Sequence, residues 1–190
     1  MEVLSHENRT FENISYTGKE VKNREFEACT FIKSDLSNSD FSYTNFIDCK
    51  FIDCNLSMMK VNSSSFRNIS FDRCKLLGVN FSDCNDFLFS VGFKDCILDY
   101  ASFSNKKMIK TKFLNSSLKE VSFLNTNLTG SLFEDTNLDR AVFSNCILKE
   151  ANFLTATNYA IDPELNKLEK AKFSLSGSVG LLSKHKIIIE

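Results

Sequence analysis

Seven cysteines are the residues of this chain best suited to chemistry, because thiolates bind metals, form disulfides and act as nucleophiles. All seven fall on one position of a five-residue pattern that otherwise holds small side chains. Free cysteine is itself a small apolar residue that is usually buried. We therefore expect structural thiols rather than metal ligands, disulfides or redox groups at Cys29, Cys49, Cys54, Cys74, Cys84, Cys96 and Cys146.

The other chemistry-bearing residues do not assemble a catalytic set. The two histidines, His6 and His185, stand at opposite ends of the chain. No His-x-x-x-His pair, glycine-rich phosphate loop or Ser-His-Asp candidate set is found. The carboxylates are dispersed over positions that we expect to face water. The sequence thus predicts a protein that is not an enzyme and that holds no cofactor and no metal.

A period of five residues governs the chain. From Phe93 to Phe153 every fifth residue is large and apolar, and the same spacing holds in another phase from Phe11 to Phe81. The residue two positions earlier is mostly Ser, Thr, Cys or Ala. A period of five fits neither a helix nor a strand. If each unit forms one short side and a corner, four units close a square coil, and stacked coils pair backbone to backbone.

The coil length of twenty residues aligns nine phenylalanines in one column. Every step between them is twenty residues except the step from Phe71 to Phe93, which is twenty-two. Side chains that recur at one place in successive coils stack on each other inside a narrow tube. We expect this core column to be Phe11, Phe31, Phe51, Phe71, Phe93, Phe113, Phe133, Phe153 and Phe173.

The repeat units resemble the pentapeptide-repeat family, whose consensus is A-(D/N)-(L/F)-x-x. Examples are SDLSN at 34–38, TNLTG at 126–130 and ANF at 151–153. The resemblance covers 11–153 and implies an all-β fold, a right-handed quadrilateral β-helix of pentapeptide repeats. LGVN at 77–80, FLFS at 87–90 and IDPE at 161–164 resemble more narrowly the branch of the quinolone-resistance (Qnr) proteins and a microcin immunity protein.

The chain divides into a pentapeptide-repeat β-helix at 1–173, with a two-residue insertion near 82–88, and a C-terminal segment at 174–190. At the insertion, Asp86 stands where a large residue is expected, and Leu88 is the first residue of the new phase. Phe87 and Phe89 are the only phenylalanines outside the pattern. Two interpretations stay open: a packed bulge, or an exposed loop in which Asp86, Phe87 and Phe89 contact a partner.

One coil later, Lys106 occupies a small position that should point inward. A buried lysine is costly unless it is paired. Asp86 lies one coil back, so local pairing is one interpretation. The other is an anion-binding patch, because 106–119 holds five lysines and no acidic residue.

The C-terminal segment predicts a cap or an interface. Asp162-Pro163-Glu164 is typical of a helix start, which predicts a helix from Pro163 to about Lys170. A second short helix is expected at 177–184 and a strand at 187–189. An open β-helix end is an unpaired sheet edge, so the apolar tail should fold back over it or pair with a second chain. The resemblance implies a homodimer through this end, with Leu181, Leu182, Ile187, Ile188 and Ile189 as the dimerisation residues.

The composition predicts a cytoplasmic protein. Residues 1–7 lack a basic region followed by an apolar run, so we expect no signal peptide. No apolar stretch approaches the ~20 residues of a membrane span. The net charge of −1 predicts neither membrane binding nor direct binding to nucleic acid.

Two functions remain for a non-enzymatic rod. Resemblance to Qnr proteins implies a DNA mimic that binds DNA gyrase or topoisomerase IV and confers antibiotic resistance. Duplex DNA of ~40 Å would carry about 23 negative charges, so mimicry would be confined to a local face. Residues 25–105 hold 11 acidic and 7 basic residues, so we expect such an acidic face on the N-terminal half of the rod. The alternative is a generic interaction scaffold or an immunity factor with another partner.

Overall fold

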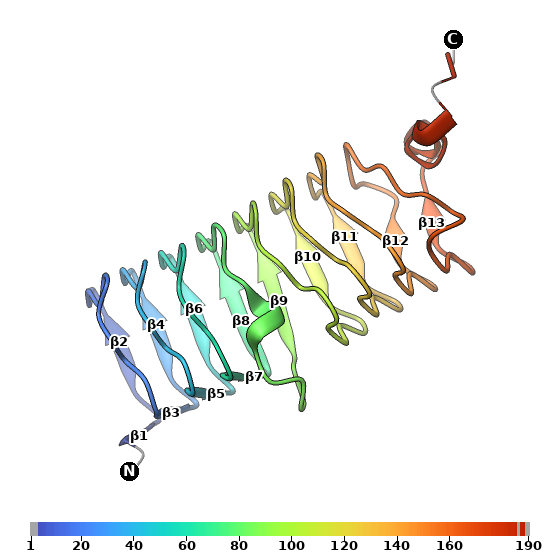
Figure 1. The fold of residues 1–190 in the computed structure, drawn as a ribbon. Helices are drawn as coiled ribbons and strands as arrows, with labels where there is room; N and C mark the ends of the chain where they lie inside the picture. Colours follow the sequence, from blue (N-terminus) through green and yellow to red (C-terminus); the bar gives the residue numbers. More distant parts are fainter. Residues whose placement is uncertain (1–3, 186, 189–190) are drawn as a thin grey trace.

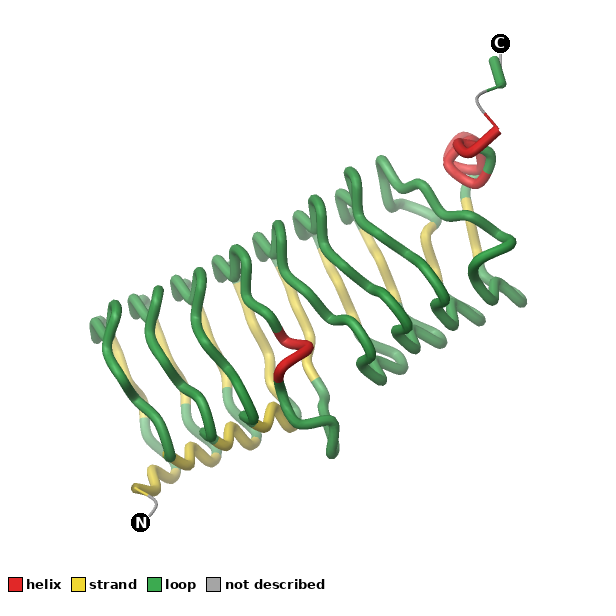
Figure 2. Tube along the Cα trace, viewed as in Figure 1, coloured by secondary structure: helices red, strands yellow, loops and turns green. Residues whose placement is uncertain are grey.

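The computed structural model describes residues 4–185, 187 and 188. The chain forms a four-sided parallel β-helix of about eight turns with a short C-terminal tail (Figure 1). This confirms the fold class that the five-residue period predicted. Each turn lies directly on the one before it, and the two termini lie at opposite ends of the rod (Figure 2).

One side of the rod is a continuous parallel sheet, which we call the long-sheet face. Its nine strands pair in the order β13-β12-β11-β10-β9-β8-β6-β4-β2. They are β2 (Thr10–Glu12), β4 (Thr30–Ile32), β6 (Lys50–Ile52), β8 (Ile69–Asp72), β9 (Val91–Lys94), β10 (Lys112–Leu114), β11 (Leu132–Glu134), β12 (Asn152–Phe153) and β13 (Lys172–Phe173).

A second side, the short-sheet face, is interrupted halfway along the rod. Its four strands are β1 (Leu4–Glu7), β3 (Arg24–Glu27), β5 (Asn45–Ile47) and β7 (Ser65–Arg67). Beyond β7 the coil containing the insertion intervenes, and parallel pairing resumes as the isolated bridges Lys107↔Asn127, Asn127↔Ile147 and Ile147↔Lys167. The two remaining sides are held by isolated parallel bridges such as Ser15↔Asp35 and Glu20↔Asp40. The insertion therefore breaks one side and leaves the long-sheet face intact.

The phenylalanine column is the core of the rod. Neighbouring rings in it stack with centroids 4.6–5.4 Å apart and planes within 17° of parallel. Phe71 pairs in register with Phe93, so the twenty-two-residue step preserves the column. Rings of the neighbouring sides meet this column edge-on, as Phe103 does with Phe93 and Phe113. Such aromatic pairs contribute ~0.5–1.5 kcal/mol each beyond the burial of their area.

The prediction of a helix at 163–170 is wrong, because this stretch forms another side of the β-helix and pairs with the coil before it. Ile147 pairs with Lys167, and the buried side chain of Asn166 forms two hydrogen bonds with the coil before it. Its Oδ1 accepts from Cys146 N at 2.9 Å, and its Nδ2 donates to Phe143 O at 3.1 Å. Residues 163–166 are turns, in which the Asp162 carboxylate accepts from Glu164 N at 2.9 Å.

The tail at 174–190 contains two 3₁₀ helices, η2 (Ser176–Leu181) and η3 (Ser183–His185), in place of the predicted helix at 177–184. The strand predicted at 187–189 is absent at Ile187 and Ile188, and Ile189 lies outside the described residues. A further 3₁₀ helix, η1 (Phe81–Asp83), precedes the insertion. None of the helices in the described part of the chain is long and apolar enough to cross a membrane.

Candidate functional site

The insertion forms a loop at residues 85–90 that extends beyond the neighbouring coils, just after η1 (Figure 2). Both ends of the loop are fixed to the coil before it. Asn85 N donates to Ser64 O at 2.8 Å, and Ser90 N donates to Phe66 O at 2.9 Å. A short loop with anchored ends on a rigid rod holds the residues at its tip in a defined place.

The two aromatic residues of the loop have opposite environments. The Phe87 side chain is 68% exposed, whereas Phe89 is 7% exposed and its ring meets Phe81 with centroids 6.2 Å apart. The prediction that Leu88 enters the core is wrong, because Leu88 is 62% exposed and turns the chain with a φ of +56°. Phe89 takes the core place instead, so it is not an exposed contact residue. We call Phe87 and Leu88 the loop tip.

Lys106, one coil after the loop, binds the beginning of the loop through its side chain. Its side chain is buried, and its Nζ donates to Cys84 O at 2.6 Å and pairs with the Asp86 carboxylate. The ammonium also lies 5.6 Å from the centroid of the Phe89 ring. The structure confirms local pairing for Lys106 and excludes this residue from an anion-binding surface. Asp86 thereby anchors the loop with one carboxylate oxygen while most of its side chain faces water.

The loop tip borders a groove lined by both apolar and polar side chains. The Arg67 guanidinium lies 5.3 Å from the centroid of the Phe87 ring and supports one face of it. On the other side, the tip and the following coil line a shallow groove with Lys107, Met108 and Ile109. Ile109 is also exposed. An exposed aromatic residue at the edge of a groove is typical of an interface that binds a protein.

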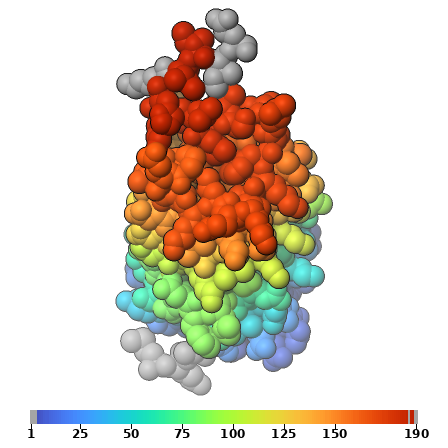
Figure 3. Space-filling model, turned by 90° about the vertical axis from the view of Figure 1, so that its right-hand side faces the viewer, coloured from blue at the N-terminus to red at the C-terminus, as the bar shows by residue number. Residues whose placement is uncertain are grey.

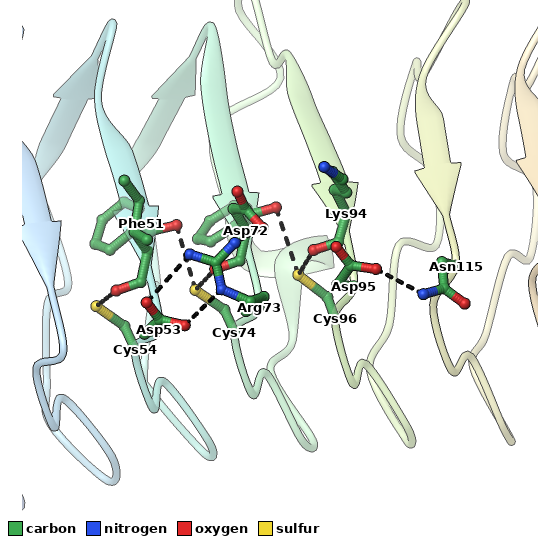
Figure 4. A network of polar contacts seen from close by, with 12 residues as sticks. Phe51, Asp53, Cys54, Asp72, Arg73, Cys74, Lys94, Asp95, Cys96 and Asn115 are labelled. Atoms are coloured by element: carbon green, nitrogen blue, oxygen red, sulfur yellow. Dashed lines mark hydrogen bonds and ion pairs between the residues drawn. The ribbon is translucent and has the colours of Figure 1, made fainter.

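Acidic residues of the N-terminal half do not form a continuous stripe along the corner that follows the long-sheet face. Arg73 lies between two of them, as Figure 4 shows: its Nε and Nη2 donate to Asp53 at 2.7 and 3.1 Å, and its Nη1 donates to Asp72 at 2.9 Å. The hydrogen bonds from Arg73 hold the pKa of Asp53 below its usual value. Asp95, one coil further on, accepts from Asn115 Nδ2 at 2.6 Å.

The cysteines are buried free thiols, as the repeat pattern predicted. Figure 4 shows three of them, Cys54, Cys74 and Cys96, in a row. Each donates to a carbonyl oxygen of the coil before it. Cys54 donates to Phe31 O at 3.4 Å and Cys74 to Phe51 O at 3.3 Å. Burial raises the pKa of Cys49 to about 12, so this thiol stays protonated at neutral pH. Within the described residues no group of His, Cys, Asp and Glu could hold a metal ion.

The tail covers the C-terminal end of the rod and leaves apolar side chains outside, and Figure 3 shows it projecting from that end. Ile161 N donates to Gly180 O at 3.1 Å, and Lys184 pairs with Asp162 at 2.8 Å. A Cβ at Gly180 would lie 2.2 Å from the carbonyl oxygen of Tyr159, so only glycine fits there. Leu181 packs against the core. The exposed apolar residues here are Leu175, Val179, Leu182, Ile187 and Ile188.

Comparison with known families identifies the repeat. The model described as "Pentapeptide repeat region" matches residues 24–103, and the model described as "Pentapeptide repeats (8 copies)" matches 96–135 and 126–157. The chain belongs to the pentapeptide-repeat family. A comparison of the sequence with curated proteins returns no match.

Solved structures show the same fold over the whole length. A trypsin-treated variant of QnrB1, described as a plasmid-mediated fluoroquinolone resistance protein, matches with a TM-score of 0.68 and 20% identity, over 99% of this chain and 98% of that one. A second trypsin-treated variant of QnrB1 has a TM-score of 0.60 and 19% identity, over 95% and 99% of the two chains. The chain is therefore a pentapeptide-repeat protein that resembles Qnr in fold.

Proposed function

We propose that this chain is a non-enzymatic, cytoplasmic rod that binds a type II topoisomerase, DNA gyrase or topoisomerase IV, and protects it from inhibitors. The observation that carries the proposal is the loop tip, where Phe87 and Leu88 are the only consecutive pair of exposed large apolar residues on the repeat coils of the described chain. The likeness in fold to a protein described as a fluoroquinolone resistance protein supports the choice of this class of partner.

The loop tip is built as an interface anchor. Aromatic residues that enter a partner's pocket contribute most of the binding energy of many interfaces. Arg67 under the Phe87 ring and the Lys106–Asp86 pair hold the tip in one place. Anchoring before binding lowers the entropy that the loop loses when the partner orders it. The rod itself, about eight turns at ~4.8 Å, is roughly 40 Å long and therefore comparable to a bound DNA segment.

In this proposal the resemblance to DNA lies mainly in the shape of the rod. Arg73 neutralises two carboxylates in the middle of the acidic half. The remaining excess of acidic residues at 25–105 amounts to a net charge of −4, far below the ~23 charges of duplex DNA of equal length. In this proposal, contacts of the loop tip therefore contribute more to binding than charge mimicry does.

A homodimer through the C-terminal end completes the proposal. Leu175, Leu182, Ile187 and Ile188 are all exposed on the tail that follows the last coil. Pairing two such ends by a two-fold axis would bury them and would double the length of the rod. A generic scaffold or immunity factor is the alternative, and it would use the same end and the same tip with another partner.

The proposal is tested by measuring binding of the full chain to immobilised gyrase and topoisomerase IV subunits. We expect the full chain to bind, and the double variant Phe87→Ala/Leu88→Asn to bind at least tenfold more weakly. Asparagine is chosen at position 88 because it accepts the positive φ of Leu88, so the loop keeps its backbone conformation. The matched control is Tyr43→Asn/Tyr100→Asn, which removes two other exposed apolar residues with positive φ. Absence of binding to both enzymes, or equal losses in the two variants, would leave the scaffold alternative.

A further inference from the structure

The C-terminal half of the rod carries a second surface, which we call the lysine groove. It is lined by Lys110, Lys112, Lys170 and Lys172 with Gly130, Leu132 and Glu150. The groove follows the corner where the chain turns into the long-sheet face. Lys112 opens β10 and Lys172 opens β13, while Lys110 and Lys170 turn the corner two residues earlier. None of these residues belongs to the loop tip.

The repeat fixes the spacing of the four ammonium groups. Lys112 pairs with Leu132, Leu132 with Asn152, and Asn152 with Lys172. The two ends of the groove are thus three coils apart, or ~14 Å at ~4.8 Å per coil. Gly130 forms part of the floor between them. A Cβ at Gly130 would come 3.4 Å from Lys110 Cγ, so the lysine stem lies across this glycine.

The chain itself does not neutralise this charge. All four lysines are exposed, and among the described residues none of them forms an ion pair. Exposed Lys107, Lys149 and Lys167 stand on the adjoining side. Of the acidic residues, Glu150 lines the groove itself, and Glu134 at the end of β11 and Glu169 lie nearby in the repeat. In the other half of the rod, by contrast, Arg73 is paired with two carboxylates. The lining of the groove, four lysines and Glu150, therefore presents a net charge of +3 (4 − 1) to a partner.

We propose that the lysine groove binds the phosphodiester backbone of nucleic acid without regard to sequence. Lysine ammonium groups act as compact point charges that suit phosphates, whereas planar recognition of carboxylates favours the arginine fork, which the groove lacks. A duplex offers about eight phosphate charges over ~14 Å. The floor of Gly130 and Leu132 holds no side-chain donor or acceptor for reading base edges.

This inference departs from the expectation, drawn from a net charge of −1, that the chain makes no direct contact with nucleic acid. Total charge does not report how charge is distributed along a rod. It also stands independently of the topoisomerase proposal, because the loop tip takes no part in it.

The test is fluorescence anisotropy of a labelled 20-base-pair duplex of arbitrary sequence with the full chain. If four phosphate contacts form, the affinity should fall on the order of 100-fold between 50 and 200 mM salt. The quadruple variant Lys110→Gln/Lys112→Gln/Lys170→Gln/Lys172→Gln should bind at least tenfold more weakly at 50 mM salt and should show a flatter salt dependence. Circular dichroism and the melting temperature verify that the variant is folded.

A matched control keeps the change in net charge the same. Lys33, Lys50, Lys60 and Lys75 are also exposed, and they lie in the other half of the rod. Their replacement by glutamine should leave the DNA affinity within about twofold of the unmodified protein, since they lie outside the ~14 Å span of the groove. The proposal is overturned if the unmodified protein does not bind the duplex at 50 mM salt or if both variants lose affinity equally. It is also overturned if poly-glutamate binds as tightly with the same lysine dependence, which would indicate an acidic protein as the partner.

Discussion

Replacing Phe113 with alanine tests the phenylalanine column at a position with ring neighbours on every side. The Phe113 ring is fully buried, and it stacks on Phe93 at 5.4 Å and on Phe133 at 4.9 Å. Phe103 and Phe123 meet it edge-on at 6.1 and 5.9 Å. Backbone ladders above and below prevent the coil from collapsing into the space left by the ring. We therefore expect a loss near the upper end of the ~3–5 kcal/mol typical of such truncations.

Phe87→Ala is the matched control, because the same side chain is removed from an exposed position. Its principal contact is with the Arg67 guanidinium, and exposed cation–π contacts contribute only ~0.5–1 kcal/mol. For a chain of this size, 1 kcal/mol corresponds to ~2–4 °C of melting temperature. We thus expect a decrease of about 6–20 °C for Phe113→Ala and of no more than ~4 °C for Phe87→Ala.

Differential scanning calorimetry of the two variants beside the unmodified protein measures both decreases. Repeat proteins unfold as coupled neighbouring units, so broadening of the Phe113→Ala transition is a further expected sign that the rod is weakened locally. Equal decreases for Phe113→Ala and Phe87→Ala would refute the reasoning that burial in the column, rather than the presence of the ring, determines stability.

Three other predictions concern the thiols, the buried lysine and the tail. Native protein should react slowly with a thiol reagent even at pH 9, because all seven thiols are buried and Cys49, with a pKa of about 12, also stays protonated, and it should react fast after denaturation; rapid native labelling of several cysteines would contradict this. Asp86→Ala should lower the melting temperature more than Lys106→Met, because the first change leaves a buried ammonium without its carboxylate and the second removes the buried charge; the opposite order would mean that the pair does not anchor the loop. Leu182→Ser/Ile188→Ser should convert a dimer to monomers in light scattering at micromolar concentration, whereas a monomeric unmodified protein would reject the dimer.

The repeat coils could be predicted from the sequence because one side chain fixes the register of each short side. Phe71 and Phe93 align although two extra residues separate them, since the buried ring determines the pairing and the loop absorbs the surplus. The pairing of Lys106 with Asp86 was predictable for a similar reason, as a buried ammonium needs a partner one coil away.

The loop and the tail could not be predicted in the same way. The period of five places Leu88 in the core, five residues before Phe93, but the neighbouring Phe89 suits the core as well, and the structure buries Phe89 and exposes Leu88. At Asp162-Pro163 the local signals favour a helix, but bonds from Asn166 and Lys167 to the preceding coil override them. The lysine groove did leave a signal, since Lys110 and Lys170 are separated by three whole coils of twenty residues.

The most direct test of the topoisomerase proposal is DNA supercoiling by purified gyrase in the presence of a fluoroquinolone, titrated with this protein. The proposal predicts that the full chain restores supercoiling in a concentration-dependent way. It also predicts that Phe87→Ala/Leu88→Asn reduces this protection at least tenfold, while Tyr43→Asn/Tyr100→Asn retains it. Supercoiling that stays inhibited at every concentration of the folded protein, with gyrase and with topoisomerase IV, would contradict the account.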